Sequence, residues 1–143
     1  MKVTDGNIVM DSAEEVKMQG AILSEPKIKD YSESYSGVSS SGGDATLDLE
    51  DGSVFSITLS EATTFIFSNP PDAGQAGALN LILTQDSAAK TIIWPFSVNW
   101  DSGVVPNLSV NSAVYILTFL TVDAGTTWYG FLSGSEMTVP LLT

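Results

Sequence analysis

Alternation of apolar and polar residues, repeated through residues 54–133, is the feature that most constrains this fold. Phe55, Ile57 and Leu59 alternate with serine and threonine, and the same spacing recurs at 79–83. A period of two places every second side chain on one face of a β-strand, whereas a helix needs a spacing of three or four. The pattern therefore predicts strands and gives no long helix.

Turn-forming residues separate these runs. Asn69-Pro-Pro-Asp-Ala-Gly74 and Asp123-Ala-Gly125 end two of them, and Asp51-Gly52 predicts a tight hairpin. Residues 114–120 are apolar on both faces, which is typical of a central strand. The result is seven or eight short strands joined by connections too brief for helical crossovers. We therefore expect an all-β fold, an antiparallel β-sandwich of jelly-roll-like type.

Charge divides the chain into two parts. Residues 1–53 hold 11 of the 17 acidic residues and four of the five lysines. We predict an N-terminal arm at 1–35, a Gly/Ser-rich linker at 36–43 and the β domain at 44–143. For the arm we favour an extended strand or hairpin, because its apolar residues lack helical spacing.

The arm is too short to bury its own apolar side chains, so a neighbouring surface is expected to cover them. The partner-contact residues that we predict on this basis are Ile8, Met10, Met18, Ile22, Leu23, Ile28 and Tyr31.

The residue types that the chain lacks exclude most kinds of catalytic and metal-binding site. The chain has no Cys, His or Arg, which removes disulfides, thiolate and imidazole metal ligands, and His-based catalytic relays. We expect no catalytic residues, no metal site and no cofactor. The net charge of −12 opposes binding to nucleic acid and to anionic membranes. The longest apolar run, 113–122, is shorter than the roughly 20 residues of a membrane span, and no leader peptide is evident, so synthesis in the cytoplasm is expected.

Two side-chain clusters have alternative interpretations. The acidic group Asp44, Asp48, Glu50 and Asp51 lacks the spacing of a calcium loop, and we interpret it as a solvated polar face rather than a Ca²⁺ site or a glycosidase pair. The aromatic residues either pack in the core or at a subunit interface, or form a platform for a sugar. The candidates for a glycan or subunit interface are Trp94, Trp100, Tyr115 and Trp128.

Several sequence blocks follow one another in a distinctive order. They are Phe65-Ile-Phe-Ser-Asn-Pro-Pro71, Leu81-Ile-Leu-Thr-Gln-Asp86, Ile93-Trp-Pro95, Ser97-Val-Asn-Trp100, Leu117-Thr-Phe119 and Thr126-Thr-Trp-Tyr-Gly-Phe131. Together these blocks resemble a β module of tailed-bacteriophage virion proteins, found at the ends of tail fibres and in related structural proteins. Residues 27–33 resemble the segment that leads into this module.

The resemblance implies a non-enzymatic virion component that is usually a homotrimer. Our leading hypothesis is a capsid decoration (cement) protein or head fibre on the exterior of the virion, attached to the major capsid protein or another virion protein through the arm. The alternative is a tail-fibre tip that recognises a host surface glycan through exposed aromatic residues and loops.

Overall fold

A computed structural model describes residues 2–4, 7–9, 25, 27 and 29–139 of the chain. The chain divides into two compact units, Met1–Tyr31 and Ser32–Thr143. In the first unit, strand β1 (Lys2–Thr4) pairs antiparallel with β2 (Asn7–Val9). These residues of the arm therefore have the extended conformation that the sequence predicts.

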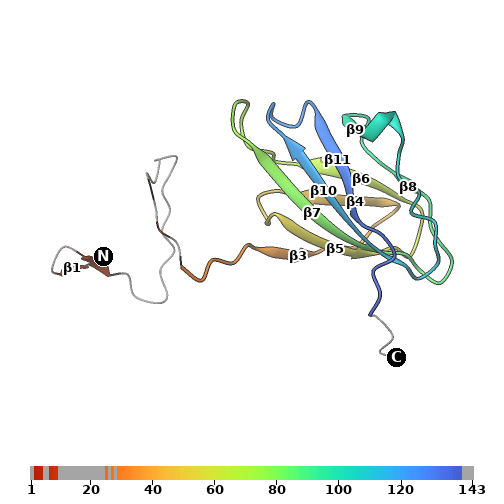
Figure 1. Ribbon diagram of the computed structural model, residues 1–143, viewed down its shortest axis with the longest axis horizontal. Helices are drawn as coiled ribbons and strands as arrows, with labels where there is room; N and C mark the ends of the chain where they lie inside the picture. The colour runs from red at the N-terminus through yellow and green to blue at the C-terminus, as the bar shows by residue number, and fades with distance from the viewer. Residues whose placement is uncertain (1, 5–6, 10–24, 26, 28, 140–143) are drawn as a thin grey trace. The chain divides into compact units, whose positions relative to one another are not determined.

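The second unit is all-β, as predicted, and its strands form two sheets (Figure 1). The larger sheet has six strands in the order β3-β5-β7-β10-β11-β9, and the smaller has the order β4-β6-β8. A single 3-10 turn, η1 (Asp101–Gly103), follows β9. The strands are β3 (Tyr35–Gly37), β4 (Asp44–Asp48), β5 (Val54–Thr58), β6 (Thr63–Ser68), β7 (Gly77–Thr84), β8 (Ile92–Ile93), β9 (Val98–Trp100), β10 (Val114–Thr121) and β11 (Trp128–Gly134).

Strand pairing corrects the prediction of an antiparallel fold. Only the pairs β7–β10 and β10–β11 of this unit are antiparallel among the described strands. The other pairs are parallel: β3–β5, β5–β7, β4–β6, β6–β8 and β9–β11. From β4 to β9 each connection carries the chain from one sheet to the other. Two parallel neighbours in one sheet are thus connected through a strand of the opposite sheet, in the position that a crossover helix often has. Short connections therefore do not require neighbouring strands to be antiparallel.

The predicted hairpin at Asp51-Gly52 is wrong for the same reason. The strands on either side of this turn, β4 and β5, belong to different sheets. The Asp51 N–H donates to the Asp48 carbonyl at 3.0 Å, so a turn is present, but it changes sheet. Gly52 has a φ of 147°, and a Cβ there would lie 2.5 Å from the Ser34 carbonyl oxygen.

The predicted linker, 36–43, contains ordered structure. Residues Ser36 and Gly37 belong to β3, which pairs with β5. Ser41 forms a bridge with Asp44. The second unit begins at Ser32, earlier than the domain boundary predicted at residue 44.

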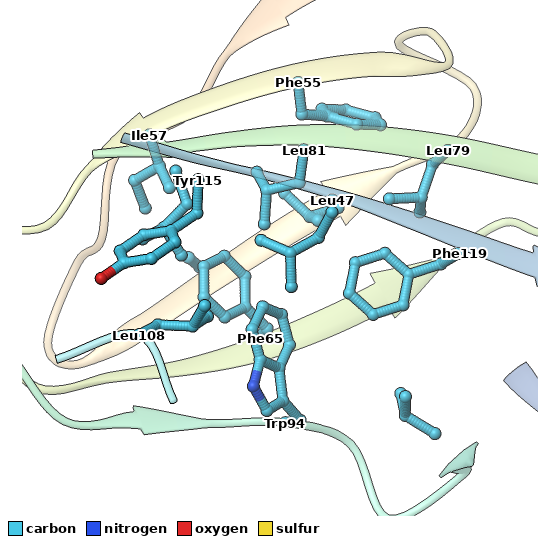
Figure 2. Packing of buried hydrophobic residues seen from close by; sticks show 14 of the residues in the cluster. Leu47, Phe55, Ile57, Phe65, Leu79, Leu81, Trp94, Leu108, Tyr115 and Phe119 are labelled. Atoms are coloured by element: carbon cyan, nitrogen blue, oxygen red, sulfur yellow. The ribbon is translucent and has the colours of Figure 1, made fainter. Parts of the chain in front are cut away.

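Side chains from both sheets form one core (Figure 2). Phe55, Ile57 and Leu59, which alternation placed on one face, are all buried, as predicted. Phe119 of β10 meets Phe67 of β6 edge to face at 4.9 Å between ring centroids. The core therefore joins the two sheets, and burial of apolar area is its main source of stability.

β10 is an interior strand of the six-stranded sheet, as the sequence predicts. Its inward residues Tyr115, Leu117 and Phe119 are completely buried. The outward residues are only partly covered, and Leu120 is 37% exposed. The strand is apolar on both faces, but only one face is in the core.

The hairpin between β10 and β11 is fixed by Asp123. Its carbonyl accepts the Thr126 N–H at 3.2 Å, and Ala124 and Gly125 both have positive φ, which defines a type I′ turn. The Thr127 N–H and the Thr121 hydroxyl both donate to Asp123 Oδ1 at 2.9 Å. The pKa of Asp123 is lowered from 3.8, chiefly by the Thr127 N–H, so the carboxylate stays ionised at neutral pH and holds the turn.

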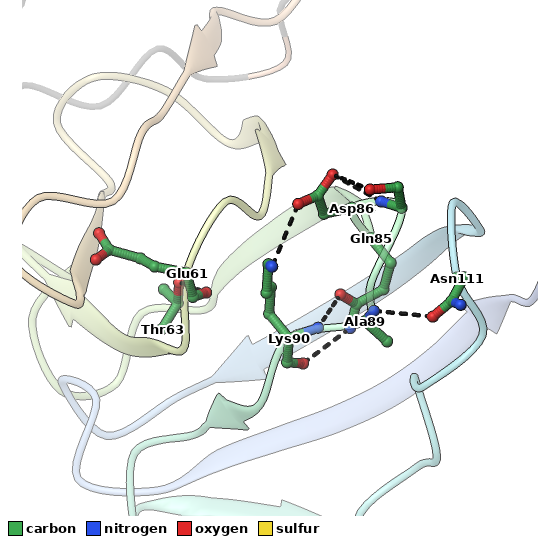
Figure 3. A network of polar contacts seen from close by, with 8 residues as sticks. Glu61, Thr63, Gln85, Asp86, Ala89, Lys90 and Asn111 are labelled. Carbon is green, nitrogen blue, oxygen red and sulfur yellow. Dashed lines mark hydrogen bonds and ion pairs between the residues drawn. The ribbon is translucent and has the colours of Figure 1, made fainter.

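A buried glutamine joins two connections, the one between β7 and β8 and the one between β9 and β10 (Figure 3). Gln85 is 2% exposed, and its Nε2 donates to the Leu108 carbonyl at 2.7 Å and to the Lys90 carbonyl at 3.1 Å. The Lys90 N–H donates back to Gln85 Oε1 at 2.8 Å. The amide therefore satisfies main-chain groups that have little access to water.

Replacing this side chain should be costly. We expect Gln85→Leu to lower the free energy of unfolding by about 2–4 kcal/mol, because it leaves buried main-chain groups without partners. Chemical denaturation at a fixed protein concentration measures this loss. Gln75→Leu, at an exposed position, is the control and should change stability little. Equal effects of the two substitutions would contradict the role of Gln85.

Candidate functional site

The six-stranded sheet is free of charge. None of its six strands, all of which the structure describes, contains Asp, Glu or Lys, although the chain has 22 such residues in 143. The charged residues of the second unit lie in the smaller sheet and in the connections. This sheet is therefore an uncharged surface on a strongly acidic protein.

The outward side of this sheet, which we call the outer sheet face, carries exposed apolar side chains. Ile82 of β7 and Leu120 of β10 are 36% and 37% exposed. Tyr129 and Phe131 of β11 are 45% and 52% exposed. Leu120 lies opposite Tyr129 in the register, and Ile82 lies opposite Ile116, with the polar pair Thr118 and Asn80 between these two rows. Exposed apolar side chains grouped on one face are typical of interaction surfaces.

Polar side chains on the outer sheet face bond mostly to one another. The Thr118 hydroxyl donates to Asn80 Oδ1 at 2.8 Å and also lies 2.9 Å from the Ser133 hydroxyl. The Tyr35 and Ser56 hydroxyls form a hydrogen bond of 2.7 Å. Because these groups already have partners, covering the face with another surface carries a low desolvation cost.

The smaller sheet has the opposite character. Its outward positions include Asp44 and Asp48 of β4. Asp48 accepts hydrogen bonds from the Glu50 N–H and from Asn69 Nδ2, and these lower its pKa below the ordinary value of 3.8. Within the described part of the chain, no three acidic side chains come together as a metal site. Within the acidic cluster 44–51, hydrogen bonds therefore hold the Asp48 carboxylate in place.

A groove runs beside the edge of the larger sheet. It has a volume of about 1000 Å³, and one wall is β11 while the other is β9 with the segment that follows it. β9 pairs with β11 only from Trp128 to Gly130, after which η1 turns the chain away. The lining residues are Asn99, Trp100, Asp101, Ser102, Val104, Pro106, Tyr129, Gly130, Phe131 and Leu132.

Gly130 sets how closely β9 approaches β11 at this groove. A Cβ at Gly130 would lie 2.8 Å from the Trp100 ring and 2.9 Å from Val98. The absence of a side chain therefore lets Trp100 lie across β11. The other side of the Trp100 ring meets Trp94 and Phe119, so this residue links the groove to the core.

Three of the four predicted glycan or subunit-interface aromatics are core residues. Tyr115 is fully buried and its hydroxyl accepts the Val110 N–H at 3.1 Å. Trp128 is 2% exposed, and Trp94 is 9% exposed and stacks on Phe65 at 4.7 Å. Trp100 alone of the four is half-buried and lines the large groove. Strand alternation places Tyr115 and Trp128 on the inward face, and Trp94 packs into the core directly after β8, so these three do not form a surface platform.

Most predicted partner-contact residues of the arm lie outside the described residues: Met10, Met18, Ile22, Leu23 and Ile28. Ile8 is in β2, opposite Val3 in the register. Tyr31 is 67% exposed. For the arm, the assignment of contact residues therefore stays a prediction.

Apart from Trp100, the residues of the outer sheet face and of the groove were not among the predicted site residues. Tyr129 and Phe131 alternate with Trp128 and Gly130, so the outward row was visible as a pattern. The sequence pattern that could have identified this row is the absence of charged residues from both faces of the strands. No sequence pattern indicates the groove, because the groove depends on the point along β11 at which β9 ends.

The comparisons with known proteins identify no relative: no family model, curated protein or solved structure matches the chain. In the part of the chain that the structure describes, no helix has the length and apolar character needed to cross a bilayer.

Proposed function

We propose that this protein is a non-enzymatic virion component of a tailed bacteriophage, a capsid decoration protein or head fibre. It assembles as a homotrimer on the exterior of the shell and attaches to capsid subunits through its N-terminal arm. The virion assignment rests on the sequence resemblance, and the trimer is carried over from it. One structural observation carries the assembly role: an uncharged six-stranded sheet that presents exposed apolar side chains.

Electrostatics favours the outer sheet face as the contact between copies. Each chain has a net charge of −12, so two copies repel through most of their surface. Contact through a sheet without charged residues keeps the acidic groups at the periphery and buries apolar side chains such as Leu120 and Phe131. Interfaces of permanent assemblies have this apolar character.

The finer fold assignment is part of the same proposal. We describe the two sheets as the layers of a β-sandwich, supported by the core that residues of both sheets share. The chain crosses between layers at each connection from β4 to β9, a feature in common with a jelly roll. Its parallel strand pairs distinguish it from a jelly roll, whose neighbouring strands are antiparallel.

The alternative, a tail-fibre tip that binds glycan, has less support. It required exposed aromatic residues, and Trp94, Tyr115 and Trp128 are buried. Of the four aromatics that the sequence offered, Trp100 alone lines the groove, where Tyr129 and Phe131 are the other aromatic residues.

Imaging of intact particles tests the location. A phage that carries this chain with a tag should show density or label at regular positions on the head. Full-length chain with Ile22→Lys and Leu23→Lys, both in the arm, should fail to attach while its circular dichroism is unchanged. Label at the tail tip, or normal head occupancy by the arm variant, would contradict the decoration role.

A further inference from the structure

We propose that the groove beside β11 is a binding site for an extended peptide segment of another protein, which adds as a strand to the edge of the six-stranded sheet. This site shares Tyr129 and Phe131 with the outer sheet face, but its main-chain edge at Leu132 lies outside that face, and the inference goes beyond the proposed assembly of copies. The site lies alongside β11 beyond Gly130, because β9, which pairs with β11 up to that residue, ends at Trp100.

The main chain of β11 is directed into this groove. The Trp128 N–H donates to the Ser97 carbonyl at 2.8 Å, so the main-chain groups of residue 128 point toward the β9 side. Main-chain groups alternate in direction along a strand, and Gly130 and Leu132 therefore point the same way. β9 pairs with Gly130 but with no residue beyond it, whereas β11 continues to Gly134. Among the described residues, no strand covers the β9 side of β11 at Leu132.

This edge lacks the side chains that normally prevent strand addition. Natural edge strands are protected by lysine, proline or charged side chains, and also by β-bulges. The open part of β11, Phe131-Leu132-Ser133-Gly134, has none of these side chains, although its pairing with β10 shifts by one residue between Leu132 and Gly134. Phe131 and Leu132 are 52% and 39% exposed, and both line the groove. Apolar side chains on either side of an open main-chain edge are the features that bind extended peptides by strand addition.

Charge indicates what kind of segment fits. The groove contains one carboxylate, that of Asp101, and no basic residue. The whole chain is acidic, which disfavours a strand from a second copy. The occupant is therefore an extended segment of a different protein, with apolar residues at alternating positions and a Lys or Arg that approaches Asp101.

A synthetic peptide tests the site directly. The probe is a fluorescein-labelled Lys-Thr-Val-Thr-Val-Thr-Val amide, used with full-length protein in fluorescence anisotropy. Two N-methylated forms, one at the threonines and one at the valines, block opposite edges of the peptide main chain. Only one edge pairs with β11, so one form should bind about tenfold more weakly and the other as well as the parent. Hydrogen exchange of the Leu132 amide should slow when the parent peptide is added.

Variants of the protein make the test specific. Leu132→Lys protects the edge and should abolish binding, while Val110→Lys, at a position 45% exposed and outside the groove lining, should bind normally. Exchange of the peptide's Lys for Glu should weaken binding to the wild type but not to Asp101→Asn. Because Leu132→Lys leaves the outer sheet face intact, its native mass should equal that of the wild type, which separates this site from the assembly role.

Three results would overturn the proposal. Equal binding of the two N-methylated peptides would show that the main-chain edge is not used. Unchanged binding by Leu132→Lys would place the peptide elsewhere. Slowed exchange at Leu132 by oligosaccharides, without any effect of the peptide, would assign the groove to sugar instead.

Discussion

Phe119→Ala should lower the free energy of unfolding by about 3–5 kcal/mol, a large part of the roughly 5–15 kcal/mol that stabilises a domain of this size. The Phe119 ring lies 4.9 Å from Phe67, 5.4 Å from Trp94 and 5.6 Å from Trp100. These partners come from both sheets and from the segment after β8. Removing the ring leaves a cavity at the point where these parts meet.

The matched control is Phe96→Ala. Phe96 is fully exposed, so the same substitution removes no buried contact and should change stability by no more than about 0.5 kcal/mol. Urea unfolding followed by circular dichroism at one protein concentration compares the two variants. A loss of less than about 1 kcal/mol for Phe119→Ala would show that the aromatic cluster does not hold the sheets together.

Strand positions were predictable because alternation and turn chemistry are local. Phe55, Ile57 and Leu59 identify β5, and Gly-, Pro- and Asp-containing segments end β6 and β10 where expected. The inward side of β5 followed from the same pattern, whereas β10 is apolar on both faces and the pattern assigned it no inward side. These predictions needed no knowledge of which strands are neighbours.

Strand pairing was not predictable because it depends on contacts distant in sequence. Asp51-Gly52 has the composition of a hairpin, yet β4 pairs with β6 and β5 with β7. A turn between strands in one sheet and a turn between two sheets use the same residues. Gln85 illustrates the same limit: it follows β7 as a plain polar residue, and its role arises from Leu108 and Lys90.

The candidate site was only partly predictable. The tryptophans were predicted as surface residues because of their type, whereas Trp128 lies on the inward face of β11 and Trp94 stacks on Phe65 in the core. The stronger signal was the lack of charge in the strands of the larger sheet. Because the strands of this sheet contain no acidic residue, another surface can cover the sheet without burying a carboxylate.

Substitution at Leu120 should have the largest effect on assembly. A charged side chain of either sign would be buried between copies, and an unpaired buried charge costs far more than an apolar contact gains. We expect both Leu120→Lys and Leu120→Glu to dissociate the assembly. The corresponding changes at Ile66, which is 42% exposed on the smaller sheet, are the controls and should leave it intact. An effect of one sign only would indicate a charged partner surface instead.

Light scattering during size-exclusion chromatography measures the native mass of the full-length protein and shows whether copies assemble through the outer sheet face. We expect three times the 15.1 kDa of the chain for the wild type and for both Ile66 variants, and the mass of a single chain for both Leu120 variants. A wild-type protein that stays a single chain at every concentration, or an assembly that neither Leu120 variant disturbs, would contradict it.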